Sequence, residues 1–193
     1  MDFQQVVRRR RMVRSFDGRP LPPGTLDRVL DNARRGPSAG FAQGVAFVAL
    51  EGQDQTAVFW DHTLPAEDRA GFHWAGLLRA PAIVICLADR ATYVARYGEP
   101  DKSGASWPVP WWDIDCAFAT MLALLTAVDA GIGALFFGIP RGEAALLGAL
   151  GVPGGMRAIG AVALGHPATD DRPSTSVAGR RRPPADIVHR GRW

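Results

Sequence analysis

Lysine and cysteine are nearly absent from this sequence of 193 residues. Lys102 is its one lysine, and Cys86 and Cys116 are its two cysteines. Both cysteines lie in apolar stretches without CxxC spacing, so we expect buried thiols in a reducing compartment and no disulfide or zinc framework. The four histidines show no HxxxH or HExxH spacing, and we therefore expect no metal site.

The sequence also shows no apolar segment behind its charged N-terminus, so no signal peptide is apparent. The longest apolar run, residues 114–138, is interrupted by Asp115 and Asp129 and by glycines at 131 and 133. This pattern predicts a core helix followed by a strand rather than a membrane span. We therefore expect a cytoplasmic protein with no membrane partner.

The positive charge is almost entirely arginine and is concentrated in two clusters, Arg8–Arg11 and Arg180–Arg182. Arginine binds phosphate as a planar fork, so two clusters favour an anionic ligand. On composition alone, a solvated basic surface is the simpler interpretation, since the net charge is only +3. Contact with nucleic acid is a third interpretation. The sequence shows neither a recognition helix nor an aromatic stacking motif, so we expect no nucleic-acid partner.

Apolar periodicity and turn residues predict a single domain over residues 1–193, with about six helices and four strands. The expected helices include a short one opening at residue 3 and others over 26–33, 66–79, 113–130 and 141–150. The expected strands cover 45–50, 81–88, 134–137 and 158–165. A long ordered loop rich in Pro, Gly and Trp is expected over 98–112. Because helices and strands do not alternate regularly, the predicted class is α+β with a layered architecture.

Two motifs that carry chemistry in other proteins fail here on context. Gly36–Gly40 matches the G-x-S-x-G elbow of serine hydrolases, which needs a strand before the serine and a helix after it. The expected order here is the reverse. Gly131-Ile132-Gly133 similarly ends a helix instead of opening one, which argues against a dinucleotide-binding turn.

Four segments in register resemble the nitroreductase family of FMN-dependent oxidoreductases. Residues 10–16, RRMVRSF, resemble the family's opening R-R-S-[I/V]-R-x-F, and residues 37–44, PSAGFAQG, resemble its P-S-x-x-N-x-Q-P loop. Residues 129–138 resemble the family's buried helix end and following strand. Residues 180–193 resemble its R-R-P tail ending in tryptophan. Order and spacing agree from residue 3 to the C-terminus.

The resemblance implies a layered fold with a mostly antiparallel central sheet flanked by helices, in a homodimer. The tail, residues 168–193, would extend onto the partner subunit. The cofactor would be FMN, its phosphate held by Arg10, Met12 and Arg181, with Arg180 or Arg182 as alternatives. Arg11 would lie along the ribityl chain or the pyrimidine edge, and Arg14 near the flavin ring. The remaining cofactor-binding residues implied are Pro37, Ser38, Ala39 and Gly40, reaching mainly the partner's flavin, then Gln43, and Phe136, Phe137 and Gly138 along the ring.

Three positions depart from the family pattern. Met12 stands where the family usually has serine, so one side-chain hydrogen bond to phosphate is lost while the backbone N–H can remain. Phe41 replaces the usual asparagine and can only stack or pack, and Gly44 replaces the usual proline. These changes bear on substrate preference more than on the flavin.

The activity implied is hydride transfer from NAD(P)H through FMN to a nitroaromatic, a quinone or a similar small acceptor, in ping-pong fashion. The cofactor supplies the redox chemistry, so we name no catalytic side chain. Trp107, Trp111 and Trp112 are candidates either for a wall of the substrate pocket or for core or dimer packing. Two alternatives share the fold: an FMN-sequestering protein with little turnover, and a specialised flavin chemistry.

Overall fold

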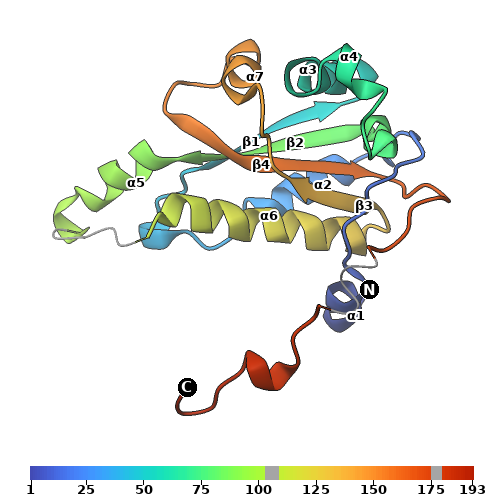
Figure 1. Cartoon of the computed structure of the whole chain (residues 1–193). Coiled ribbons are helices and arrows are strands. Elements are labelled where there is room, and N and C mark those ends of the chain that lie inside the picture. Colours follow the sequence, from blue (N-terminus) through green and yellow to red (C-terminus); the bar gives the residue numbers. More distant parts are fainter. Residues whose placement is uncertain (103–108, 175–179) are drawn as a thin grey trace.

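Four antiparallel strands form the centre of the computed structural model, which describes residues 1–102, 109–174 and 180–193. The strands are β1 (Val45–Glu51), β2 (Ala82–Asp89), β3 (Gly133–Phe137) and β4 (Met156–Gly165), and they lie in the order β1-β2-β4-β3 (Figure 1). β2 pairs with β1 on one side through residues 82–88 and with β4 on the other through residues 82–89. The predicted α+β class and antiparallel sheet are confirmed.

Both faces of the sheet are covered, because alternate residues of each strand point to opposite sides. Val84 and Cys86 belong to a core shared with α2 (Thr25–Ala33) and α6 (Trp111–Asp129). Ile83 and Ile85 belong to a second core, shared with α3 (Gln53–Thr63) and α7 (Glu143–Ala149). Figure 1 shows α2 and α6 on one side of the sheet and α3, α4 (Ala66–Arg69) and α7 on the other. The chain is therefore a three-layer arrangement.

Helix α6 is long and apolar enough in composition to span a membrane, yet it lies along the sheet. Cys116, Ala123, Leu124 and Ala127 of this helix are buried in the first core. The helix begins at Trp111, directly after Pro110, and ends at Asp129 before Gly131, whose φ is 75°. The prediction of a core helix here is confirmed.

Several sequence predictions were wrong in detail. The single helix expected over 66–79 is two short pieces, α4 (Ala66–Arg69) and η2 (Ala75–Arg79), separated by a turn that contains Gly71. The expected loop over 98–112 is shorter: η3 (Pro100–Lys102) follows α5 (Arg90–Tyr97) at its start, and α6 already begins at Trp111. Trp107 lies outside the described residues. Helices α3 and α5 (Arg90–Tyr97) were not predicted at all.

The segment after α1 and the segment after β4 both lie beside the sheet, close to β3. Helix α1 (Phe3–Arg9) is capped by the Asp2 side chain, and the following segment bridges Met12 to Ala134 of β3 and Phe16 to Pro167. Residues 180–193, with the short η4 (Pro184–Asp186), are exposed throughout and extend away from the sheet past α1 (Figure 1). The packing of this tail across a partner subunit, like the assignment of residues 1–193 to one domain, stays a prediction.

Candidate functional site

The opening segment, residues 10–14, runs along the outer edge of β3. Arg10 closes α1 with its N–H donated to the Val6 carbonyl, and the Val13 N–H donates to the Ala134 carbonyl at 2.9 Å. The Met12 side chain is half-buried and packs against both cores. Met12 therefore offers a ligand at most its backbone, and the arginines on either side supply the charge.

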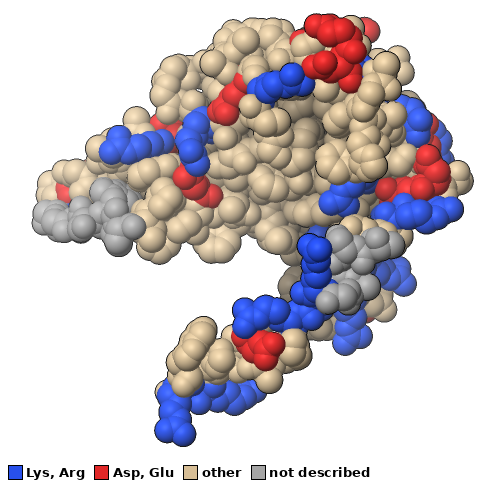
Figure 2. Space-filling model, in the orientation of Figure 1, with Lys and Arg blue, Asp and Glu red and all other residues tan. Residues whose placement is uncertain are grey.

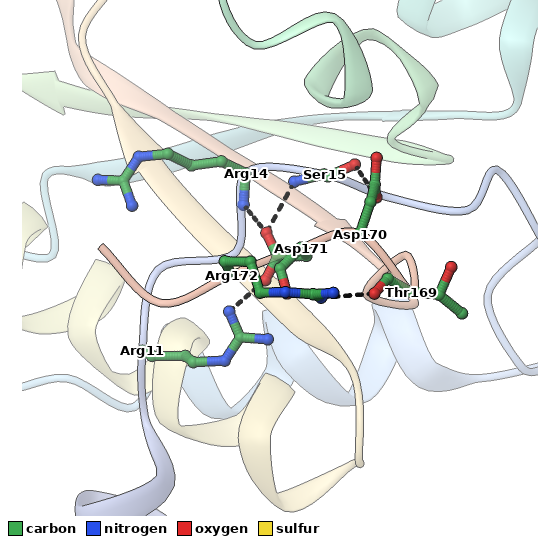
Figure 3. A network of polar contacts seen from close by, with 7 residues as sticks. All are labelled: Arg11, Arg14, Ser15, Thr169, Asp170, Asp171 and Arg172. Atoms are coloured by element: carbon green, nitrogen blue, oxygen red, sulfur yellow. Dashed lines mark hydrogen bonds and ion pairs between the residues drawn. The ribbon is translucent and has the colours of Figure 1, made fainter. Parts of the chain in front are cut away.

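A polar network fixes this segment to the start of the tail (Figure 3). The carboxylate of Asp171, whose side chain is 2% exposed, pairs with Arg11 and accepts the backbone N–H groups of Arg14 at 2.9 Å and Ser15 at 3.0 Å. Asp170 accepts the Ser15 hydroxyl at 2.8 Å. The charge of Arg11 is thus matched within the chain, which gives this arginine a structural partner that the sequence did not reveal.

Arg10 and Arg14 differ from Arg11, because among the described residues neither pairs with a carboxylate. The Arg14 guanidinium lies 5.9 Å from the centre of the Trp74 ring, in cation–π range. It borders a cleft of about 710 Å³ that His73, Trp74 and Asp170 also line. In the part of the chain that the structure describes, Arg10 and Arg14 thus have no carboxylate partner, and guanidinium groups of this kind donate hydrogen bonds to the oxygens of a phosphate monoester. The residues present therefore fit an FMN phosphate.

The loop 37–43 is held at the other end of α6. The Ala39 N–H donates to Asp115 Oδ2 at 2.7 Å, and the Gln43 N–H donates to Ser38 Oγ at 2.8 Å. Asp115 lies near the start of α6 and is buried. With Ser38, Phe41, Gln43 and Asp115, this loop borders a second pocket of about 430 Å³.

Backbone strain is concentrated in this loop. Within the described residues, Phe41 (φ 54°) and Gln43 (φ 58°) are the non-glycine residues with left-handed backbone, and Gly40 beside them has φ 61°. Such a conformation costs a non-glycine residue about 1–3 kcal/mol and is found disproportionately at functional sites. Phe41 is also 75% exposed, so burial of its own ring does not offset the cost.

Phe136, Phe137 and Gly138, which were predicted to line the other edge of the flavin ring, lie at the end of β3. Phe137 is half-buried and stacks on Trp60, with ring centres 6.0 Å apart and planes at 11°. Phe136 points to the opposite core, against Gly160 of β4. Gly138 is exposed. The aromatic rings thus belong largely to the core, and their proximity to a flavin stays a prediction.

The opening segment and the loop 37–43 lie toward opposite ends of α6. The loop 37–43 contacts Asp115, whereas the N-terminal amine of Met1, next to the opening segment, binds Asp129 at 2.7 Å. Fourteen helical positions at 1.5 Å each separate these two aspartates by about 21 Å. One subunit therefore does not bring the arginines and the loop together.

The tail arginines Arg180 and Arg181 are exposed and lie in the segment that extends past α1. Figure 2 shows Lys and Arg side chains gathered along this tail and beside the N-terminal region. Their role at the phosphate stays a prediction.

Sequence reasoning missed Asp171, Asp115 and also Tyr93, whose hydroxyl donates to Asp115 Oδ2 at 2.7 Å. Asp115 was noted only as an interruption of an apolar run, and a carboxylate in such a run is itself a signal, because burial of a charge needs hydrogen-bond donors. Asp171 stands 160 residues from Arg11 in the sequence, and nothing local points to that pairing.

Comparison with known proteins decides the family. Residues 7–166 match the profile of the Nitroreductase family. The chain belongs to the Nitroreductase family. Membership supports an oxidoreductase activity, and it covers the opening segment, the loop 37–43, the sheet and α6.

Relatives and solved structures agree with this assignment over nearly the whole chain. A protein of Archaeoglobus fulgidus, provisionally named an NADH dehydrogenase/NAD(P)H nitroreductase, is 27% identical over 98% of this chain and 97% of its own length. A nitroreductase family protein of Clostridium difficile is similar in structure, with a TM-score of 0.73 at 17% identity and full coverage of both chains. A provisionally named nitroreductase of Desulfovibrio desulfuricans, solved in complex with FMN, gives a TM-score of 0.72 at 22% identity and covers 97% of this chain and 95% of its own.

Proposed function

We propose that this nitroreductase family chain is an FMN-dependent oxidoreductase. It would pass hydride from NADH or NADPH to a nitroaromatic, a quinone or a similar small acceptor in two half-reactions at one site. The observation that carries the proposal is the edge of β3, where Arg10 and Arg14 lack carboxylate partners among the described residues and Met12 is anchored to Ala134. When bound, FMN supplies the hydride chemistry; the protein binds, orients and shields it.

The proposed roles follow the charges of the opening segment. Arg10 binds the phosphate, together with the Met12 backbone and, from the tail, Arg181 or its neighbours Arg180 and Arg182. Arg14 lies nearer the ring, where a cation stabilises the anionic reduced flavin. Arg11 already pairs with Asp171, so it contributes chiefly by fixing the segment, although its guanidinium, on a side chain that is 37% exposed, can still reach the ribityl side.

The active unit is proposed to be a homodimer. Asp115, which binds the loop 37–43, and Asp129, which binds the N-terminal amine next to the opening segment, lie about 21 Å apart along α6, so we infer that a complete site needs the loop of a second subunit. Apolar side chains on α1 and α6 are exposed as a dimer face would require: Phe3, Val7, Phe118 and Met121. The tail exposes Ile187, Val188 and Trp193, which would pack on the partner. We place the protein in the cytoplasm, in keeping with its two unpaired thiols.

The test distinguishes binding of the FMN phosphate from binding of the rest of the flavin. Apoprotein is titrated with FMN and with riboflavin, which lacks the phosphate, and binding is followed by quenching of flavin fluorescence. Arg10→Met should weaken FMN binding roughly tenfold or more and leave riboflavin binding nearly unchanged, because one charge-assisted contact is removed. Arg19→Met is the matched control, since Arg19 is exposed and pairs with Asp17.

Purified wild type should be yellow, or become so with FMN, and NADH or NADPH should bleach it under anaerobic conditions. A protein that takes up no FMN would overturn the proposal. Bound flavin that neither nicotinamide reduces at a useful rate would instead indicate the sequestering alternative. Product analysis with a nitroaromatic distinguishes simple reduction from a specialised flavin chemistry.

A further inference from the structure

The strained loop of the site is held by one face of helix α5. Tyr93, Arg96 and Tyr97 lie at positions i, i+3 and i+4, on the same side of the helix. Arg96 Nε donates to the Gly40 carbonyl at 3.0 Å. A Cβ at Gly40 would lie 2.7 Å from the Tyr97 ring, and a Cβ at Gly44 would lie 2.5 Å from the Tyr93 ring. The Cβ at Gly44 would also lie 2.8 Å from the Asp89 carbonyl oxygen, so both positions favour glycine.

A chain of hydrogen bonds ties both halves of the loop to α6. Asp115 Oδ2 accepts the Tyr93 hydroxyl and the Ala39 N–H, each at 2.7 Å. The Tyr93 hydroxyl lies 3.4 Å from Ser38 Oγ, which in turn accepts the Gln43 N–H. Burial, followed by the bonding to Asp115, raises the pKa of Tyr93, so the phenol stays a neutral donor to the carboxylate. The buried carboxylate is thus satisfied by neutral donors that belong to, or support, the loop.

The same contacts fix where Phe41 lies. Its backbone is left-handed and its ring is 75% exposed, so burial of the ring in the core does not stabilise this backbone conformation. The residues that hold its neighbours are those of α5 and Asp115. Phe41 also borders the 430 Å³ pocket beside Asp115, and an exposed planar ring on a backbone that is held in place is a surface on which another planar ring can stack.

We propose that Asp115 and Tyr93 are positioning residues that hold the loop 37–43 in its strained conformation, so that Phe41 presents its ring to a planar aromatic or quinonoid acceptor. The proposal rests on the proposed function for its acceptor, because the loop must border the flavin of the partner subunit. Asp115 and Tyr93 act through the loop, and Phe41 is the residue that contacts the acceptor.

Two measurements test the network and the acceptor separately. Hydrogen exchange at the Ala39 and Gln43 amides reports on the loop in the purified protein, whether or not flavin is bound. Steady-state kinetics at saturating FMN compares a planar quinone with ferricyanide, which has no ring to stack. Tyr93→Phe removes the hydroxyl and keeps the ring against Gly44, and Asp115→Asn keeps an oxygen that can accept the Ala39 N–H.

We expect Tyr93→Phe to speed exchange at both amides roughly tenfold and to raise the KM for the quinone several-fold, a larger change than any in ferricyanide turnover. Asp115→Ala should do the same, and Asp115→Asn should restore much of the protection. Phe41→Leu should raise the quinone KM alone. Thr63→Val is the control, because it removes a buried hydroxyl that bonds the Phe59 carbonyl on the opposite side of the sheet.

If hydrogen exchange at the Ala39 and Gln43 amides were unchanged in Tyr93→Phe and Asp115→Ala, the proposal that these residues hold the loop would be overturned. Faster exchange with an unchanged quinone KM, or equal effects from Thr63→Val, would overturn the role in acceptor binding. A wild type that binds no FMN would defeat the proposed function and the acceptor role with it. In that case the exchange data would still decide whether Asp115 and Tyr93 hold the loop.

Discussion

The carboxylate of Asp171 joins the opening segment to the start of the tail, where it accepts two consecutive backbone N–H groups and pairs with Arg11. Each arginine of the cluster is a plausible phosphate ligand by residue type alone. The structure separates them by their internal partners, since Arg11 has one and Arg10 and Arg14 have no carboxylate among the described residues. A guanidinium already paired with a buried carboxylate contributes less net charge to an incoming anion.

Asp171→Ala should therefore lower the free energy of unfolding by about 3 kcal/mol, because it leaves two N–H groups and one guanidinium without their acceptor. Urea unfolding of the flavin-free protein measures the change. Asp170→Ala is the matched control: this carboxylate is at the surface and accepts one serine hydroxyl, so its loss should cost less than about 1 kcal/mol. Equal losses in the two variants would contradict the assigned role of Asp171.

At the residue level, the sequence predicted the arginines and the loop residues of the site, but it did not predict the side chains with which they form ion pairs and hydrogen bonds. Arginine chemistry and the register of four motifs indicate which side chains suit FMN. The acceptor of Arg11 lies 160 residues away and that of the Ala39 N–H lies 76 residues away, and such pairings are set by the fold. The strain at Phe41 is equally invisible in sequence, since the expected backbone for phenylalanine is right-handed or extended.

Among the elements, those with an uninterrupted apolar pattern were predicted well and those without it were missed. Strand β2 and helix α6 are apolar along most of their length and were assigned within about two residues. Helix α3 buries Thr56, Phe59, Trp60 and Thr63. Two of these four are threonines, whose hydroxyls bond carbonyls one turn earlier, so the apolar pattern of the helix is broken. Helix α5 has eight residues and buries Tyr93 alone, too little for a periodic signal.

Two buried thiols at the contact between β2 and α6 should make the protein less stable at alkaline pH. Cys86 of β2 and Cys116 of α6 are fully buried, and burial raises the pKa of Cys86 to about 11 and that of Cys116 to about 12. Because these values exceed the unfolded pKa of about 9, the contribution of the thiols to stability is complete below pH 9 and is lost as the pH rises toward 11–12.

The free energy of unfolding should then fall by about 2–3 kcal/mol between roughly pH 8 and pH 10 from the two thiols together. Urea unfolding at both pH values gives the difference. The double variant Cys86→Ala/Cys116→Ala should show a correspondingly smaller decrease, although it starts from lower stability. Parallel decreases in the wild type and the double variant would assign the alkaline loss to other groups.

At the scale of the whole molecule, the sheet and α6 keep two incomplete half-sites apart. The edge of β3 presents cations, and the start of α6, with α5, presents the strained loop. A rigid helix about 21 Å long between the aspartates at its two ends prevents one subunit from closing the site on itself. A symmetric dimer solves this, because its two-fold axis can bring the arginines of each subunit to the loop of the other, twice.

Subunit complementation tests that arrangement directly. Arg10→Met/Arg14→Met should disable the phosphate side, and Gly40→Val should displace the loop, since a branched side chain at φ 61° would meet the Tyr97 ring. In a heterodimer of the two variants, one composite site carries both defects and the other carries none. Random assembly makes half of the dimers mixed, so co-expression should restore roughly a quarter of wild-type flavin sites.

Flavin content per subunit, measured by absorbance after gel filtration at a limiting FMN concentration, provides the readout. Two differently tagged copies of Arg10→Met/Arg14→Met serve as the control, and their co-expression should restore nothing. If each site is instead built within one subunit, the heterodimer holds no intact site, and the mixed preparation should show only the average flavin content of its two parents. A monomeric elution volume for the wild type would refute the composite site as well.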